Sequence, residues 1–567
     1  MRMIARATLI ALVAITLSGS VHGQRTARPP LSASHINDIA LLLKLEDTRQ
    51  FDEVALTRLI ASAHPEVKRR AIVSIGRIVN DKGRALLAAL HGETDPELVA
   101  TVAFASGQLK DPGAVAWLSD LLTNRRTPVM TAKEAAQALG KIRTPDAHAA
   151  LANYLLTVPA ATARPAVVGE ALLSLGRFTT KEDLAPILRW TTARDVEVRW
   201  RATWALYRPR NPDAVPHLLT LSTDPAADVR FWALRGLTPT QVDEAGLRRT
   251  EAAARLRQAL NDPDRRVRTE GLRALVAYDD DASFEATLGA LTSTDNWLSV
   301  SAAEAIGRAT RTSIVVPALV AASASGKPTA MRLSALTSLV AVAPDDARAL
   351  ANALATDASA TARQAATQAL RQLDAAAARA TQSASGSAPA GRAGIAPGAG
   401  RGNGPLRPPL TARPDADYRA LVTSWIVPDY NGEPRPRVVL GTPRGSIEIE
   451  LYPGDAPFGV EYLLKVIASG EIVNTEFGRV VPNFVAQQRA IRSEGTLRDE
   501  VNQQGLTRGN LSWASSGLDT GRPGYTLGST PQPHNEGDFT ALGRVVIGLN
   551  VVDRLELGDK ITSARRK

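Results

Sequence analysis

The chain has 567 residues, a formal net charge of +10 and no cysteine. This length predicts more than one domain. The absence of cysteine excludes disulfides, thiolate nucleophiles and zinc–cysteine sites. The seven histidines are scattered without a second histidine at ligand spacing, so we expect no metal site. Arginine is dispersed along the chain, which argues against a nucleic-acid-binding patch.

Residues 1–23 have the pattern of a secretory signal peptide. Arg2 and Arg6 precede a short apolar stretch, and Val21-His22-Gly23 offers a small-residue cleavage site before Gln24. The apolar stretch is much shorter than the roughly 20 residues that a membrane-spanning helix needs. The sequence therefore predicts an exported protein, periplasmic or extracellular, with no membrane span. A chain without cysteine suits such an oxidising compartment.

Residues 35–375 repeat a helical pattern with a period of about 30 to 38 residues. Helices are predicted to begin where an acidic or hydroxyl residue precedes proline, as at Asp95-Pro96 and Asp262-Pro263. Two further marks recur, an apolar residue followed by a base and a glycine that ends a helix. The first mark is Val67-Lys68, Val198-Arg199, Val229-Arg230, Val267-Arg268 and Met331-Arg332, and the second is Gly76, Gly107, Gly140, Gly176 and Gly307.

This array resembles HEAT-type repeats. The resemblance implies an all-α superhelical solenoid whose inner surface binds other proteins. A spacer without a ligand is the alternative. Trp200, Trp204 and Trp232 are either exposed anchors on that surface or partly buried core residues.

Residues 376–414 are rich in Gly, Ala, Pro, Ser and Arg. Such a segment cannot bury enough apolar area to fold, so it is predicted to be a flexible linker. Its "GAGRGNG" lacks the preceding strand and following helix that a dinucleotide-binding motif needs. We expect the solenoid and the following domain to be separate cooperative units joined by this linker.

Residues 415–567 have a different pattern. A short helix over residues 418–425 precedes the strands "RVVL" and "SIEIELY", which the turn "GTPRG" joins into a hairpin. "PFGVEYLLKVIASG" is helical, "FGRVVPNFV" and "GNLSWA" are strand-like, and "ALGRVVIGLNVVDRL" runs from a strand into a helix. Several strands with two helices predict a closed β-barrel capped by helices.

The segments "GSIEIELYPGDAPFGVEYLLKVIASG", "TEFGRVVPNFVAQQ", "RGNLSWA" and "LGRVVIGLNVVDRL" resemble, in order and spacing, the cyclophilins, which are peptidyl-prolyl cis–trans isomerases. The resemblance covers about residues 437 to 565. It implies a multidomain chain in which an all-α HEAT-like solenoid precedes a mainly-β, cyclophilin-like closed barrel with capping helices. The implied substrates are proline-containing polypeptide clients, and no cofactor is needed.

The resemblance assigns catalysis to Arg479, Phe484 and Gln487. A fixed guanidinium suits the reaction because the prolyl nitrogen regains its lone pair as the X–Pro bond twists, and a donor aimed at that nitrogen stabilises the twisted state. The phenylalanine supplies an apolar floor, and the glutamine holds substrate backbone or the arginine. The resemblance assigns substrate binding to Phe477, Val485, Trp513, Ala514, His534 and Phe539.

Several positions depart from the family pattern. The family's histidine and methionine are Gly478 and Val485 here, and Gly524 and Thr526 stand near the family's second glutamine and second pocket phenylalanine. Two functional hypotheses follow. In the first, the barrel is an isomerase and the repeats hold clients near it, raising the local concentration of X–Pro bonds.

In the second hypothesis the protein is a non-catalytic scaffold. The repeats bind partners, and a degenerate barrel binds proline peptides without isomerising them. Arg479 would then be a structural arginine paired with Glu476 or Asp519.

Overall fold

The computed structural model describes residues 28–178, 183–278, 280–307, 311–384, 413–489, 491 and 496–567. The predicted signal peptide and most of the predicted linker therefore lie outside the described residues. Within the described part of the chain, no helix combines the length and the apolar character needed to cross a membrane.

The first part of the chain is a solenoid of paired helices, in which α3, α5, α7, α9, α11, α13, α16, α18 and α20 pack side by side. Three single turns of tighter helix connect some of its members: η1 (Pro112–Ala114), η2 (Ala160–Thr162) and η3 (Pro212–Ala214). The helices are α1 (Ala33–Thr48), α2 (Glu53–Ile60), α3 (Pro65–Ile78), α4 (Gly83–Ala88), α5 (Pro96–Gln108), α6 (Val115–Thr123), α7 (Val129–Ile142), α8 (Pro145–Thr157), α9 (Pro165–Leu175), α10 (Ala185–Leu188), α11 (Val196–Tyr207), α12 (Val215–Leu221), α13 (Ala227–Leu234), α14 (Pro239–Glu244), α15 (Arg249–Ala259), α16 (Arg265–Leu275), α17 (Asp281–Ala290), α18 (Asn296–Ile306), α19 (Thr312–Ala322), α20 (Thr329–Val342), α21 (Pro344–Leu354) and α22 (Ala360–Ala384).

The repeated glycines let neighbouring helices approach closely. A Cβ atom on Gly107 would lie 2.8 Å from the Cα atom of Ala138 in the next repeat, and a Cβ atom on Gly140 would lie 2.8 Å from the Cα atom of Ser174. Such contacts are too short for any side chain, so only glycine fits. The tryptophans of this region are buried, since Trp200, Trp204 and Trp232 are 4%, 1% and 2% exposed, respectively. They are core residues and not exposed anchors.

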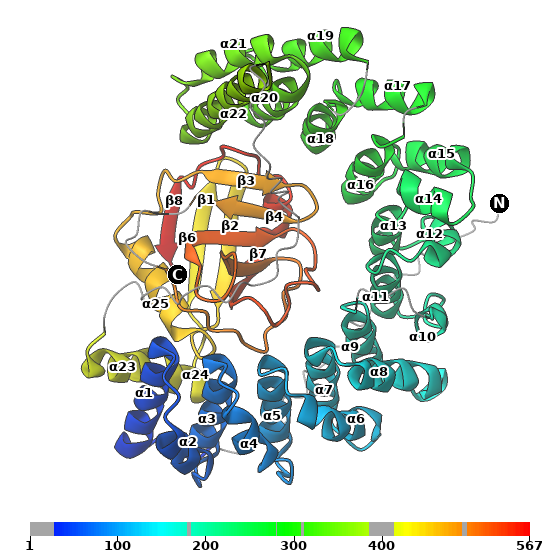
Figure 1. Cartoon of the computed structure of the whole chain (residues 1–567). Helices are drawn as coiled ribbons and strands as arrows, with labels where there is room; N and C mark the ends of the chain where they lie inside the picture. The colour runs from blue at the N-terminus through cyan, green and yellow to red at the C-terminus, as the bar shows by residue number, and fades with distance from the viewer. Residues whose placement is uncertain are drawn as a thin grey trace, which may run out of the picture.

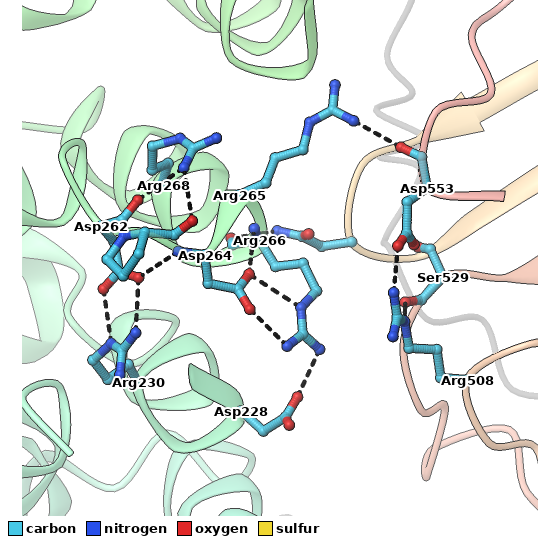
Figure 2. A network of polar contacts seen from close by, with 12 residues as sticks. Asp228, Arg230, Asp262, Asp264, Arg265, Arg266, Arg268, Arg508, Ser529 and Asp553 are labelled. Carbon is cyan, nitrogen blue, oxygen red and sulfur yellow. Dashed lines mark hydrogen bonds and ion pairs between the residues drawn. The ribbon is translucent and has the colours of Figure 1, made fainter. Parts of the chain in front are cut away.

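The repeated basic residues link each repeat to the next. Arg199 pairs with Asp224 at 3.0 Å, and Arg230 pairs with Asp262 at 2.7 Å in the network of Figure 2. The same arrangement recurs further along the solenoid: Arg268 with Asp295 and Arg332 with Asp357. Each pair is partly buried and joins groups about one repeat apart, so the ladder fixes the register of successive repeats.

The last part of the chain is a curled, eight-stranded antiparallel sheet in the order β3-β4-β6-β5-β7-β2-β1-β8. Helices α25 (Pro457–Ala468) and α26 (Leu549–Val552) accompany it. The strands are β1 (Arg437–Thr442), β2 (Gly445–Leu451), β3 (Phe477–Val481), β4 (Val485–Gln488), β5 (Asn510–Ala514), β6 (Arg522–Gly528), β7 (Ala541–Ile547) and β8 (Ser563–Arg566). The predicted fold class, a helical solenoid followed by a mainly-β barrel, is confirmed.

The barrel closes through short backbone contacts and not through a full ladder. The edge strands are β3 and β8. The residues that begin β3 bond to the segment before β8, with Phe477 N donating to Asp559 O at 2.8 Å and Gly558 N donating to Phe477 O at 3.0 Å.

The segment "FGRVVPNFV", predicted to be strand-like, forms two strands joined by a turn. Pro482 has no N–H to donate and Asn483 adopts φ 61°, which turns the chain between β3 and β4.

The barrel sits within the concave side of the solenoid, which wraps around it from α1 to α22 (Figure 1). Polar side chains of the solenoid donate to backbone carbonyls of the barrel. Arg77 donates to Val501 O at 2.9 Å, and Lys141 donates to Gly537 O at 2.8 Å. Further donations of this kind are Gln108 to Gly537, Arg177 to Pro533 and Glu536, and Arg265 to Asp553, the last visible in Figure 2.

Both ends of the solenoid make specific contacts with the barrel. At the first end, Arg49 forms a two-pronged ion pair with Asp519, at 2.7 and 2.9 Å, and both side chains are almost completely buried. At the other end, Glu476 of the barrel accepts hydrogen bonds from the backbone N–H groups of Ala360 and Thr361. A carboxylate at this position satisfies the unpaired N–H groups of the first turn of α22 and complements the helix dipole.

The segment that precedes the barrel belongs to the solenoid core by its packing. It forms α23 (Asp415–Leu421), the π-helical turn η4 (Val422–Ile426) and α24 (Val427–Tyr430). Its apolar residues share one cluster with residues of α1 and α3. The Tyr418 hydroxyl also donates to Asp47 at 2.8 Å.

The prediction of two separate units is therefore wrong. Buried ion pairs and hydrogen bonds join the solenoid to the barrel at both ends and in the middle. The inner surface that we expected to bind other proteins contacts the chain's own barrel. Composition did not reveal this, because most of these bonds end on backbone carbonyls, which have no sequence signature.

Candidate active site

The candidate site is built on the β3–β4 hairpin. Arg479 and Gln487 are opposite each other in the register of the two strands, so their side chains share one face. Phe484 closes the turn between the strands. The Phe484 carbonyl accepts a hydrogen bond from Ser529 N at 3.0 Å, which fixes the turn to the segment after β6.

The solenoid holds the same turn from the other side. The Asn483 amide donates to Arg266 O at 2.8 Å, and Arg273 donates to Pro482 O at 3.3 Å. Asn483 is 1% exposed, and Thr530 donates to its carbonyl at 2.9 Å. Helix α16 therefore positions the turn that carries Phe484.

Arg479 is exposed and directed at the site's other two residues. Its Nη1 lies 3.4 Å from Gln487 Oε1, and its Cζ lies 5.6 Å from the centroid of the Phe484 ring. Partial desolvation lowers the pKa of Arg479 from its ordinary value, yet the guanidinium remains charged because that value lies far above neutral. Among the described residues it has no acidic partner. The two candidate structural partners bind elsewhere, Glu476 at the start of α22 and Asp519 on Arg49.

A cavity of about 470 Å³ opens over these three residues. The predicted residues Val485, Trp513, Ala514 and Phe539 also line it. So do Gly524 and Thr526, the two departures from the family pattern, and the Thr526 hydroxyl is 2.6 Å from that of Ser512. The described residues contain no cluster of histidine and acidic side chains suited to a metal ion.

Two predicted substrate-binding residues lie outside this cavity. Phe477 is 2% exposed and packs in the barrel core, because the irregularity between Phe477 and Arg479 turns its ring inward. His534 stacks on Phe484 with ring centroids 5.7 Å apart, but it faces a neighbouring cavity on the solenoid side.

Several residues of the cavity wall were not predicted from the sequence. Gln532 and Asn535 belong to the loop before β7 and bond to each other at 3.0 Å, and Gln532 also approaches Phe484 O at 3.5 Å. Ser512, Ser515, Ser516, Thr520 and Arg522 complete the polar side of the wall. Ser512 lies in β5 and Arg522 begins β6, whereas the others lie in loops, where polar residues follow no periodic pattern that a sequence signal could identify.

Gly478 shows how the site accommodates the solenoid. A Cβ atom on this residue would lie 3.4 Å from Arg489 Cβ and 3.7 Å from Thr361 Oγ1, in the first turn of α22. A Cβ atom would therefore already be in van der Waals contact with Arg489, the residue after β4, and with α22. The glycine therefore leaves room for α22 beside β3.

The arrangement can favour a twisted prolyl bond. Planarity of the X–Pro amide is maintained by resonance, with a barrier of about 18–20 kcal/mol. A proline ring on Phe484 would place its nitrogen near the guanidinium of Arg479, which is held by Gln487 and needs no proton transfer to act. A donor fixed before the reaction stabilises the twisted state more than either planar state.

Comparisons with known proteins agree with this geometry. The family model "Cyclophilin type peptidyl-prolyl cis-trans isomerase/CLD" matches residues 437–566, and a model of HEAT repeats matches residues 53–133, 83–168 and 158–238. Three curated peptidyl-prolyl cis–trans isomerases are among the relatives. The isomerase of Synechococcus elongatus is 31% identical over 23% of this chain and 94% of its own length.

The isomerase of Helicobacter pylori is 33% identical over 22% of this chain and 81% of its own length. Isomerase B of Bacillus subtilis is 34% identical over 21% of this chain and 90% of its own length. The matched region of this chain thus spans most of the length of each relative. The same region carries Arg479 and Gln487 beside Phe484. It belongs to the cyclophilin-type peptidyl-prolyl cis–trans isomerases, with HEAT repeats preceding the isomerase domain.

Proposed function

We propose that this protein catalyses the isomerisation of X–Pro bonds in polypeptide clients and so assists their folding. The single observation that carries the proposal is the placement of Arg479, which lies over Phe484, bonds to Gln487 and has no acidic partner among the described residues. The structural arginines of this chain are held by a carboxylate, as Arg49 is, or by backbone carbonyls, as Arg177 is, and Arg479 has neither partner among the described residues. Clients reach the barrel at the open cavity of about 470 Å³ beside the solenoid, since the barrel occupies the inner surface of the repeats.

The test is the refolding of a protein whose slow phase is limited by an X–Pro bond. Uncatalysed isomerisation takes tens to hundreds of seconds. We expect catalytic amounts of the full chain to shorten that phase in proportion to its concentration and to leave the fast phases unchanged. An unchanged slow phase would contradict the proposal.

A scaffold without catalysis is the competing function, and the small and polar residues Gly524 and Thr526 in the cavity wall favour it. This candidate predicts that a proline peptide binds the full chain while its isomerisation rate stays at the uncatalysed value. The refolding assay and a binding titration with the same peptide distinguish the two functions.

We also propose that the protein is exported. The basic and apolar pattern of residues 1–23 and the absence of cysteine support this proposal. Expression in a bacterial host, followed by N-terminal sequencing of the protein from the periplasm or medium, should give a chain that begins near Gln24. Recovery of only the Met1 form from the cytoplasmic fraction would contradict export.

A further inference from the structure

A second cavity adjoins the candidate active site. Its volume is about 560 Å³, within the range of about 300–1,000 Å³ that is usual for ligand pockets. Phe484 lines both cavities, so they meet at the floor of the proline site. One wall of the second cavity comes from the barrel, with Val481 and His534, and the opposite wall comes from α11, α13, α16 and α18 of the solenoid.

The Phe484 ring has one neighbour from each of these cavities. Arg479, which lines the first cavity, has its Cζ 5.6 Å from the ring centroid, and the His534 ring, which lines the second cavity, stacks at 5.7 Å. A polypeptide advances about 3.3 Å per residue when extended. A client with its proline at Phe484 is therefore within one or two residues of the second cavity if its chain runs in that direction.

The solenoid wall of this cavity carries more positive than negative charge. Arg235 is neutralised by Glu270 at 3.1 Å. Arg208 has no acidic partner among the described residues, and Arg273 donates only to the Pro482 carbonyl. The remaining carboxylate is that of the exposed Glu304 on α18.

His534 is the titratable group that the barrel contributes to this cavity. Its side chain is exposed in the second cavity, between the barrel and the solenoid. Partial desolvation there, together with the positive charges of Arg208, Arg235 and Arg177, lowers its pKa. The imidazole is therefore neutral at pH 7 and adds no charge to the cavity. The positive potential comes from the solenoid arginines.

We propose that the HEAT repeats form the second wall of the substrate cleft and select clients with acidic residues near the isomerised proline, with Arg208 as the main selecting side chain. The inference rests on the proposed function for its catalytic readout and names the substrate class of that same site. A guanidinium without an internal partner can form a charge-assisted hydrogen bond with a client carboxylate. Arg273 on α16 adds positive charge to the same wall while it donates to the Pro482 carbonyl of the catalytic turn.

The experiment uses the full chain and short Ala-Pro peptides that differ only in flanking residues: three Glu, three Gln or three Lys, placed before or after the proline. For one placement, we expect kcat/KM to be about 3- to 10-fold higher for the Glu peptide than for the Gln peptide, and lower for the Lys peptide. The Glu preference should shrink at high ionic strength because salt screens partly exposed charges. Arg208→Gln should bring the Glu-to-Gln ratio close to one.

Arg126→Gln is the matched control. Arg126 lies exposed on the loop between α6 and α7 and lines neither cavity. Arg126→Gln removes the same charge as Arg208→Gln but at a position away from the cavities. It should therefore leave the Glu-to-Gln ratio at the wild-type value. Equal kcat/KM for the three peptides in both placements would overturn the inference, as would a Glu preference that Arg208→Gln retains.

Failure of catalysis is distinguishable from failure of selection. If no peptide is isomerised, the proposed function is wrong, and the inference is decided by the dissociation constants of the same peptides, measured by fluorescence anisotropy. Tighter binding of the Glu peptide that Arg208→Gln abolishes would support an acidic-client cleft. Equal dissociation constants would overturn it.

Discussion

Replacing Arg479 by alanine should reduce kcat/KM for an Ala-Pro peptide by about 10²–10³, or about 2.7–4 kcal/mol of transition-state stabilisation. The guanidinium acts mainly on the twisted bond, so the loss should fall mainly on kcat. The fold should remain intact, because Arg479 is exposed and its removal leaves no buried charge unpaired. A coupled isomerisation assay with the full chain measures the effect, and circular dichroism checks the fold.

Three further variants sharpen this result. Arg479→Lys should not restore the rate, because an ammonium lacks the planar fork of donors. Phe484→Ala should instead raise KM by removing the apolar floor. Arg544→Ala removes an exposed arginine of β7 that does not line the cavity, so its rate should match the wild type. An Arg479→Ala variant as active as wild type would show that the guanidinium is not catalytic.

Replacing Arg77 by methionine should lower the free energy of unfolding by about 3–5 kcal/mol, the usual cost of removing one partner of a buried ion pair. Arg77 is 4% exposed and pairs with Glu46 at 2.9 Å. It also donates to the carbonyls of Val501, Asp455 and Glu500 in the barrel. Its loss leaves the buried Glu46 carboxylate without its ion-pair partner and removes these hydrogen bonds between the solenoid and the barrel. Urea unfolding measures the change.

Two controls accompany this variant. Arg77→Met combined with Glu46→Gln removes the stranded charge and should recover part of the lost stability. Arg126→Met, at an exposed arginine, should change the stability by no more than about 0.5 kcal/mol. An Arg77→Met chain that unfolds at the same urea concentration as wild type would mean that this contact does not hold the barrel in the solenoid.

The elements were largely predictable from the sequence. The helix starts at Asp95-Pro96 and Thr144-Pro145 are confirmed, but α16 begins at Arg265, two residues after the start predicted at Asp262-Pro263, because the Asp264 side chain caps it. The glycines near helix ends and the basic residue in each repeat reflect contacts inside or between neighbouring repeats, which a periodic pattern records. In the barrel, alternating strands such as β2 were equally clear. Strands β6 and β8 were missed because "RPGYTLG" contains a proline and two glycines and "SARR" has no apolar alternation.

The sequence predicted the site residues whose chemical type is required for the reaction. It did not predict positions that depend on how the barrel packs against the solenoid. Arg479, Phe484 and Gln487 meet as expected. The position of His534 on the solenoid side of Phe484 depends on how the barrel docks, and docking runs through donors such as Lys141 and Arg177 to backbone carbonyls. A carbonyl is present at every residue, so the sequence alone does not show which one is bound.

The most direct test of the central claim, that this solenoid-bound barrel is an isomerase, is exchange NMR of an Ala-Pro peptide at equilibrium. The uncatalysed cis and trans forms interconvert too slowly to give exchange cross-peaks. With a small amount of the full wild-type chain we predict cross-peaks between the two forms, which weaken strongly when Arg479→Ala replaces it. A wild-type chain that binds the peptide, as judged by shifted resonances, without producing any exchange cross-peak would contradict the account.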